Sequence, residues 1–191
     1  MIIATNNQGK INEIKKIFHE YKIHSLKEKG LNVDVLEDQD TFLGNAKKKA
    51  KEIYEIIHEE TIADDSGLCI KALDGFPGVM THRFLGDNAT DRMRNEYLIH
   101  EIDKYNDRSA QVICSLVYYN GTKFIEAEGV LDGFISRECR GKNGFGFDEI
   151  FELPNGLTLA ELSPEEKNEI SARAVAIKTL KKRLESHNIW F

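Results

Sequence analysis

Two neighbouring aspartates, Asp64 and Asp65, are the strongest candidates for chemistry in this 191-residue chain. They belong to the stretch TIADDSGLCI, which predicts a strand running into two carboxylates and a glycine. Neighbouring side chains of a strand point to opposite faces, so only one aspartate can face a given site. Glu37, in LEDQDTF, could supply a second carboxylate, and such a pair together with substrate phosphates would suit Mg²⁺. The alternative for this acidic stretch is a solvent-facing turn.

The beginning of the chain has the pattern of an anion-binding junction. An apolar run over residues 2–4 breaks into the polar segment TNNQGK, after which apolar residues recur at steps of three and four. This predicts a strand, a polar loop and a helix, whose first N–H groups and positive dipole end suit phosphate. The sequence has no P-loop or GxGxxG pattern here. The alternative is that Asn7 only caps the helix.

A glycine-rich loop, GKNGFGFDEIF, offers a different kind of contact. Its glycines let the backbone approach a ligand closely, while Phe145 and Phe147 present flat rings for stacking. The alternative is a tight loop whose aromatic rings seal the core. Lys167, Arg173 and Arg83 could hold a phosphate or a base carbonyl, although each alone is typical of surface charge.

The other elements predict a mixed α/β fold. Strands are expected over residues 22–26 and 31–38, the second at a sheet edge, and a hairpin is expected to turn at Asn120-Gly121. Helices are expected over residues 41–60 and 89–102, and two more at the end of the chain. The first of these begins with a capping box of Ser163 and Glu166, and Ser171 could cap the second.

Composition and charge exclude several classes of protein. A hydrophobic content of 41% and a charged content of 30% are typical of a globular protein, expected here as one domain over residues 1–191. The net charge of −6 argues against a nucleic-acid polymer as partner. No apolar run approaches the ~20 residues of a membrane span, and the start lacks a signal-peptide core. Four lysines of the second helix are interpreted as a solvated face: Lys47, Lys48, Lys49 and Lys51.

Cysteine and histidine usage points to neither a disulfide framework nor a zinc site. Cys69, Cys114 and Cys139 are scattered and are interpreted as inert thiols in a reducing cytosol, a catalytic thiol being the alternative. The histidines lack metal-ligand spacing, and the sequence has no Ser-His-Asp order or GxSxG elbow. The terminal Trp190-Phe191 would pack on the domain or on a second subunit.

Taken in order, several of these segments resemble the inosine triphosphate pyrophosphatase family over essentially the full length. The resemblance implies Mg²⁺-dependent hydrolysis of ITP, dITP and XTP to the monophosphate and pyrophosphate, which clears deaminated purines from the nucleotide pool. It implies an elongated central mixed sheet with flanking helices, and two lobes around a nucleotide cleft. It also implies a cytoplasmic homodimer. The segments that carry it are TNNQGK, EDQDTFLGNAKKKA, ADDSGL, GFPGVMTHRF, GFGFDEIF and LSPEEKNEISAR.

The resemblance assigns roles to single residues. The family's Thr-x-Asn-x-x-Lys motif falls on Thr5, Asn7 and Lys10, which implies a grip on the triphosphate with Lys10 as catalytic counter-charge. The metal carboxylate falls on Glu37 and the catalytic aspartate on Asp65. Asp65 would orient or deprotonate the attacking water, or hold Mg²⁺.

The remaining substrate contacts fall later in the chain. Ser66 lies beside Asp65 in the implied site, and the late lysine of the family falls on Lys167. The Ser-His-Arg triplet falls on Ser171-Ala172-Arg173, with Arg173 as the base-reading arginine. The purine-stacking loop falls on Phe145, Gly146, Phe147 and Asp148.

Departures from the family pattern concern the base. Phe147 replaces a tyrosine and keeps the ring, while Glu149 replaces a proline and loosens the backbone. Ala172 replaces the histidine, so one contact to the purine 6-oxygen edge is missing and discrimination should weaken by ~1–3 kcal/mol. Two alternatives therefore stay open: a nucleotide-binding protein with reduced or altered turnover, and a pyrophosphatase of broadened base specificity.

Overall fold

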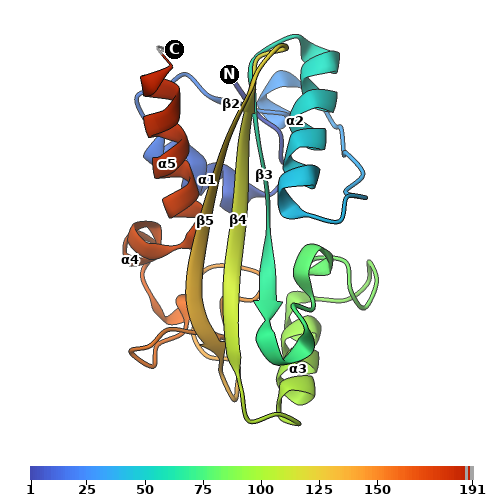
Figure 1. Cartoon of the computed structure of the whole chain (residues 1–191), viewed down its shortest axis with the longest axis vertical. Coiled ribbons are helices and arrows are strands. Elements are labelled where there is room, and N and C mark those ends of the chain that lie inside the picture. The colour runs from blue at the N-terminus through green and yellow to red at the C-terminus, as the bar shows by residue number, and fades with distance from the viewer. Residues whose placement is uncertain (188, 190–191) are drawn as a thin grey trace. The chain divides into compact units, whose positions relative to one another are not determined.

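The computed structural model describes residues 1–187 and residue 189, and over these the chain forms a six-stranded sheet with five α-helices (Figure 1). The strand order is β2-β1-β3-β4-β5-β6. Strand β1 pairs in parallel with β2 and β3, whereas β5 pairs antiparallel with β6, so the predicted mixed α/β class is confirmed. The strands are β1 Ile2–Ile3, β2 His24–Ser25, β3 Thr61–Ile70, β4 Ser109–Tyr119, β5 Phe124–Ile135 and β6 Phe151–Glu152. The helices are α1 Gln8–Ile17, α2 Phe42–Ile57, α3 Asp91–Ile102, α4 Pro164–Ile170 and α5 Ala172–Ser186.

The chain divides into two compact units. Unit 1 consists of Met1–Asp65, Cys114–Gly129 and the chain from Ala172 onward, and unit 2 consists of Ser66–Ile113 and Val130–Ser171. The long strands β3, β4 and β5 contribute residues to both units. Trp190-Phe191, for which the sequence left two packing alternatives, lies outside the described residues.

Side-chain caps start several of the helices, and two of these caps, Asn7 and Ser163, are residues that the sequence indicates. Asn7 caps α1, because its side-chain oxygen accepts the Lys10 N–H at 3.1 Å. Thr41 and Thr90 cap α2 and α3 in the same way. The predicted capping box of α4 is present, with Ser163 as the N-cap residue.

The core of unit 1 explains both a correct and an incorrect prediction. Ala46, Ala50 and Ile53 of α2 pack against β1, β3 and β4, as their helical spacing predicts. The edge strand predicted over residues 31–38 is wrong, since these residues form no strand in the structure. Their apolar side chains still alternate and pack against the same core, but the Val33 carbonyl accepts a hydrogen bond from the Asn6 side chain. The alternating burial of residues 31–38 therefore does not depend on strand pairing.

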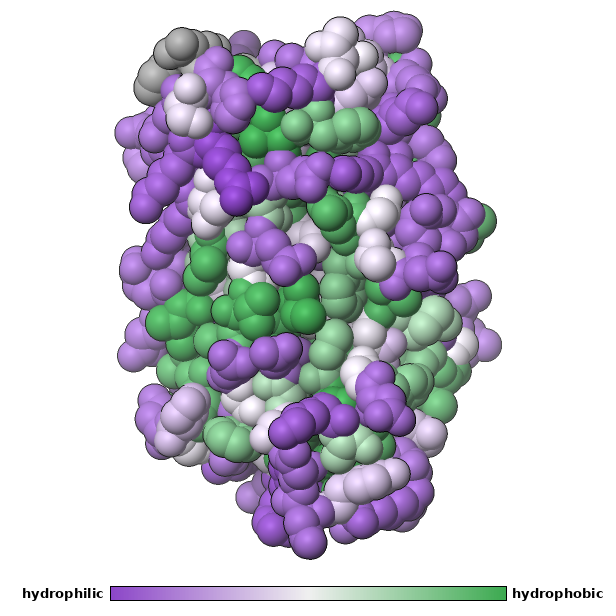
Figure 2. Space-filling model, viewed as in Figure 1, coloured by the Kyte–Doolittle hydropathy of each residue, from purple (hydrophilic) through white to green (hydrophobic). Residues whose placement is uncertain are grey.

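Part of the strand surface remains uncovered by helices. Figure 2 shows apolar surface over β4 and β5 on the face drawn, and hydrophilic surface over α5. Val130 and Phe134 of β5 are among the exposed large apolar side chains. Of the helices built from the described residues, none combines the length and the apolar character needed to cross a membrane.

Helix α5 begins directly against the backbone of β5 within unit 1. A Cβ atom added at Gly129 would lie 2.0 Å from the carbonyl oxygen of Ala172 and 2.7 Å from the amide nitrogen of Ala176. Both of these atoms belong to the backbone, so no side-chain rotation can relieve the contact. The absence of a side chain at Gly129 therefore sets the position of the first turn of α5, which carries Arg173.

We expect Gly129→Ala to lower the free energy of unfolding by roughly 1–3 kcal/mol or more, because α5 must move away from β5. Urea denaturation measures the loss. Gly30→Ala is the matched control, since Gly30 has a left-handed φ of 73° but no atom within 4 Å of the added Cβ. Alanine at position 30 is strained by the left-handed φ alone, so a loss in Gly129→Ala no greater than in Gly30→Ala would contradict the packing explanation.

Candidate active site

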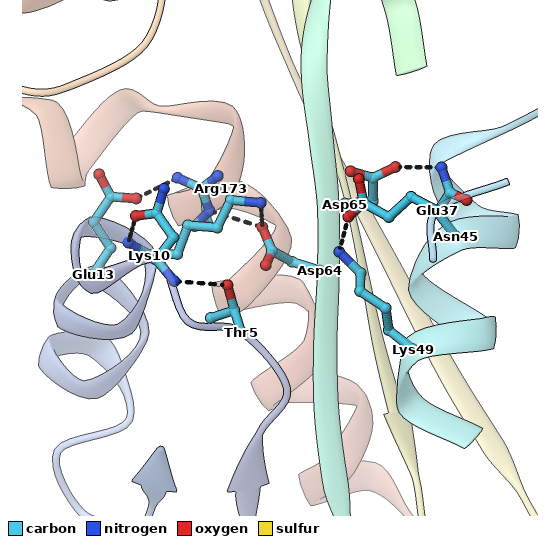
Figure 3. A network of polar contacts seen from close by, with 10 residues as sticks. Thr5, Lys10, Glu13, Glu37, Asn45, Lys49, Asp64, Asp65 and Arg173 are labelled. Atoms are coloured by element: carbon cyan, nitrogen blue, oxygen red, sulfur yellow. Dashed lines mark hydrogen bonds and ion pairs between the residues drawn. The ribbon is translucent and has the colours of Figure 1, made fainter. Parts of the chain in front are cut away.

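The two aspartates lie in the middle of β3, and their side chains point to opposite faces of the strand (Figure 3). The predicted alternation of Asp64 and Asp65 is therefore confirmed. The prediction that they end the strand is wrong, because β3 continues to Ile70 with buried residues on both sides of the pair. The two carboxylates consequently belong to two separate groups of polar side chains, both within unit 1.

On one face, Asp64 is the shared counter-charge of two buried cations. Its Oδ2 lies 3.1 Å from Lys10 Nζ and 3.2 Å from Arg173 Nε. Arg173 Nη1 also lies 2.5 Å from Glu13 Oε2 of α1. Burial alone would raise the pKa of Asp64, but the charges of Lys10, Arg173 and Lys49 outweigh it and hold that pKa below its usual range. Asp64 therefore remains ionised and fixes both cations.

On the other face, Asp65 lies in a group of α2 side chains and Glu37. Asn45 Nδ2 donates to Asp65 Oδ2 at 2.8 Å, and Lys49 Nζ lies 2.6 Å from Glu37 Oε1. Burial raises the pKa of Asp65, and the negative charge of Glu37 adds to the rise, while Lys49 and Asn45 oppose it. A carboxylate with a raised pKa is a stronger base than an ordinary aspartate.

Lys49 is a residue of this group that the sequence analysis missed. The interpretation of Lys47, Lys48, Lys49 and Lys51 as one solvated face is wrong for Lys49, whose side chain is only 9% exposed. Burial would lower the pKa of Lys49, but the charges of Asp64, Glu37 and Asp65 raise it overall. Lys49 follows Ala46 by three residues, so the same helical spacing that marked the buried face could have identified it.

The polar loop before α1 contains Thr5 and Asn7, which the sequence analysis predicts to bind phosphate. The Asn7 N–H donates to Thr5 Oγ1 at 3.2 Å, and Asn7 also caps α1, so the capping alternative describes part of its role. Lys10 extends from the first turn of α1 toward Asp64. The junction is thus held by its own hydrogen bonds, and it places Lys10 on the Asp64 face of β3.

The carboxylates of unit 1 fit a hard cation that is only partly coordinated by protein. Among the described residues, no group of three or more His, Cys, Asp or Glu side chains could hold a metal ion. Glu37 and Asp65 interact with each other and with Lys49, and they offer oxygen atoms alone. Mg²⁺ commonly binds one or two carboxylates together with substrate phosphates, so this donor set fits it.

The aromatic loop belongs to unit 2 and has its own buried ion pair. Lys167 Nζ lies 2.6 Å from Asp148 Oδ2, and both side chains are at most 10% exposed. The same carboxylate oxygen accepts the Phe145 N–H at 2.8 Å, and Lys167 Nζ lies 4.6 Å from the centre of the Phe145 ring. The structure therefore brings together Phe145, Asp148 and Lys167, three residues that the resemblance names as separate substrate contacts. Ser66 is buried on β3 at the start of this unit.

The cysteines show no sign of a nucleophilic thiolate. Cys114 is fully buried, and burial raises its pKa to about 12. Burial also raises the pKa of Cys69 and of Cys139. These directions support the prediction of inert thiols and disfavour the alternative of a catalytic one.

Comparison with known proteins decides the family. The model of the Ham1 family matches residues 1–183 of this chain. The chain belongs to the Ham1 family. It is 39% identical over 194 residues to a dITP/XTP pyrophosphatase of Clostridium tetani, covering 98% of this chain and 96% of that relative.

Solved structures show the same fold as this Ham1 chain. The Ham1 protein of Staphylococcus aureus matches with a TM-score of 0.88 and 38% identity, covering 97% of this chain and 98% of that one. A nucleoside-triphosphatase / dITP/XTP pyrophosphatase of Mycobacterium abscessus matches with a TM-score of 0.76 and 32% identity, covering 94% and 97%. The resemblance predicted from the sequence motifs is thereby confirmed, while the roles of single residues stay predictions.

We expect Asp64→Asn to lower the free energy of unfolding by roughly 3–5 kcal/mol, because Lys10 and Arg173 would keep buried charges without their counter-charge. The pKa of Asp64 is lower in the folded chain than its unfolded value of 3.8. The ionised carboxylate therefore contributes fully to the free energy of unfolding above pH 3.8, and this contribution is lost as the pH falls through the folded pKa. The difference between wild type and variant should therefore be largest near neutral pH and shrink below about pH 4. Urea denaturation across this pH range measures it.

Asp38→Asn is the control for that prediction. Asp38 also forms an ion pair, with Lys48 at 2.7 Å, but its side chain is 47% exposed. Solvent screens such a pair, so little change is expected. A loss of stability for Asp64→Asn no greater than for Asp38→Asn would show that Asp64 is not the counter-charge of the two cations.

Proposed function

We propose that this Ham1-family chain hydrolyses the non-standard purine nucleoside triphosphates ITP, dITP and XTP to the monophosphate and pyrophosphate. The relatives named dITP/XTP pyrophosphatase support the substrate class. The observation that carries the proposal is the group on one face of β3, where the buried Asp65 lies beside Glu37 and Lys49. Such a group provides a base and a cation for phosphoryl chemistry.

Asp65 is proposed as the base that orients or deprotonates the attacking water. Its raised pKa and its hydrogen bond from Asn45 give it both the basicity and the fixed orientation for this role. Attack of the water breaks the bond between the first and second phosphate groups. When bound to Glu37 and Asp65, Mg²⁺ would supply polarisation of the phosphoryl oxygens.

The cations of unit 1 are proposed to bind the triphosphate. Lys10 lies on the Asp64 face, but its charge also lowers the pKa of Asp65, so it is near enough to balance phosphate charge there. Thr5 and Asn7 would bind through the polar loop. Lys49, already beside the carboxylates, would contact the phosphates as well. Lysines are rarely buried unless they are paired, and Lys10 and Lys49 are both buried beside the carboxylates of Asp64 and Glu37.

The base is proposed to stack on Phe145 and Phe147, with Gly146, Asp148 and Lys167 shaping that part of the site. Ser66 is proposed to contact the substrate next to Asp65. Arg173 is proposed to read the purine 6-oxygen. In the structure this guanidinium is bound by Asp64 and Glu13, which orient it.

We further propose a cytoplasmic homodimer whose two-lobed protomer is one functional domain. Uncovered apolar side chains of unit 2, among them Phe76, Met80 and Tyr97, support association with a second copy. The net charge of −6 supports a small nucleotide rather than a nucleic-acid polymer as the partner.

A second candidate is a nucleotide-binding protein without turnover, and one observation favours it. Ala172 is buried and apolar at the position where the resemblance places a histidine, so a contact to the base is missing. The intact Glu37, Lys49 and Asp65 group favours the enzyme instead.

We expect Asp65→Asn to lower pyrophosphate release from ITP by about 10²- to 10⁴-fold, because the amide cannot accept the proton of water. Glu37→Gln should raise the Mg²⁺ concentration needed for half-maximal rate. Steady-state assays after chelation and stepwise addition of Mg²⁺ measure both. Asp40→Asn, an exposed carboxylate of the same acidic stretch, is the control. Undiminished turnover in Asp65→Asn would refute the assignment of the base.

We expect the wild-type chain to release pyrophosphate from ITP, dITP and XTP faster than from GTP or ATP. Ala172→His should increase the preference for ITP over ATP by roughly 5- to 150-fold, because it restores a contact worth ~1–3 kcal/mol. The same assay with each nucleotide in turn measures the preference. If ITP binds tightly but neither protein releases pyrophosphate, the non-enzymatic candidate is correct.

A further inference from the structure

Two side chains of helix α3 form hydrogen bonds with the backbone of Gly146, in the middle of the aromatic loop over residues 145–148. Asn95 Nδ2 donates to the Gly146 carbonyl at 2.9 Å, and the Gly146 N–H donates to Asp91 Oδ2 at 2.9 Å. Asp91 and Asn95 are four residues apart, so they lie on the same face of α3. All of these residues belong to unit 2.

The two bonds differ in their exposure to solvent. Asn95 is 1% exposed and its bond to the Gly146 carbonyl is partly buried, so water would replace this donor poorly if it were removed. The Asp91 side chain is 51% exposed and contributes less for that reason. Gly146 itself has a left-handed φ of 63°, a conformation that costs other residues free energy. The hydrogen bonds from α3 therefore hold the loop in this left-handed conformation at Gly146.

The flanking residues of the loop are fixed by a different element. Asp148 accepts the Phe145 N–H and pairs with Lys167 of α4, which also lies over the Phe145 ring. The residue that follows, Glu149, replaces the proline of the related family pattern, so no ring restrains the backbone there. The restraint therefore comes from hydrogen bonds, and those at Gly146 act on the residue between Phe145 and Phe147 in the chain.

We propose that Asn95 and Asp91 are positioning residues that hold Phe145 and Phe147 in the orientation that stacks the purine. The inference rests on the proposed placement of the base at this loop. Neither residue needs to touch the substrate, because each acts through the peptide groups of Gly146. Their loss should weaken binding of the base and leave the interaction with the phosphates unchanged.

The test compares a base-bearing and a base-free ligand. In Asn95→Leu, which keeps a similar volume but removes the donor, the KM for ITP should rise about tenfold with a smaller change in kcat. Inhibition by inorganic tripolyphosphate, which has no base, should keep its wild-type inhibition constant. Asp91→Ala should raise the KM several-fold, and Asp91→Asn, which keeps an acceptor oxygen, should restore it. Glu101→Gln, on the same helix but away from the loop, is the matched control.

Phe147→Ala separates this inference from the proposal on which it rests. A raised KM in Phe147→Ala and in both α3 variants supports the positioning role. A raised KM in Phe147→Ala alone overturns that role and leaves the base placement standing. No effect in Phe147→Ala shows that the base does not bind at this loop, and the inference fails with it. Equal weakening of ITP and tripolyphosphate in Asn95→Leu and in Asp91→Ala overturns the inference, since it reveals a general structural loss.

Discussion

The alternation of side chains along β3 directs Asp64 and Asp65 to opposite faces of one strand, and the polar organisation of unit 1 depends on it. Asp64 fixes Lys10 and Arg173, which come from helices far apart in the sequence. Asp65 faces Glu37 and α2. A shift of the strand by one residue would bring Ala63 or Ser66 into one of the two places, and that group of side chains would lose its carboxylate.

The electrostatic balance of these groups explains why a cation is expected with the substrate. Lys49 already balances part of the charge of Glu37 and Asp65, and Asp64 balances Lys10 and Arg173. If it binds as proposed, a triphosphate would bring several more negative charges to side chains that already largely neutralise one another. In the proposed site, repulsion by Glu37 and Asp65 would oppose binding of the triphosphate, and a divalent ion held by these carboxylates and by the phosphates would remove that repulsion.

Sequence patterns predicted those parts of the fold and site that depend on local chemistry. The caps at Asn7 and Ser163 and the hairpin turn at Asn120 are of this kind, because each is decided by a few neighbouring residues. The roles of Lys10, Asp65, Asp148 and Lys167 were predicted by resemblance rather than by spacing, and the pairing of Asp148 with Lys167 was not predicted. The strand predicted over residues 31–38 was wrong, because alternation reports burial and not pairing.

The features that the sequence did not predict depend on contacts between distant segments of the chain. Glu13 and Asp64 become partners of Arg173 only after α1, β3 and α5 have packed together, and no local pattern signals that contact. Lys49 is the exception, since its place on the apolar face of α2 was readable. It was grouped with its neighbours by charge, although the helix periodicity assigns it to the buried side.

In each unit, a buried ion pair fixes a lysine of the proposed site. In unit 1 the buried Asp64 binds the buried Lys10, and in unit 2 the buried Asp148 binds the buried Lys167. A buried ion pair adds little net stability, because desolvation offsets the attraction, but breaking it leaves an uncompensated charge. Each pair therefore adds little to the free energy of unfolding but makes displacement of either side chain costly. Such an ion pair suits a residue whose exact position matters. In both units the carboxylate binds a lysine from another segment. The carboxylate of Asp64 also binds Arg173 in unit 1, and that of Asp148 also accepts the N–H of Phe145 in unit 2.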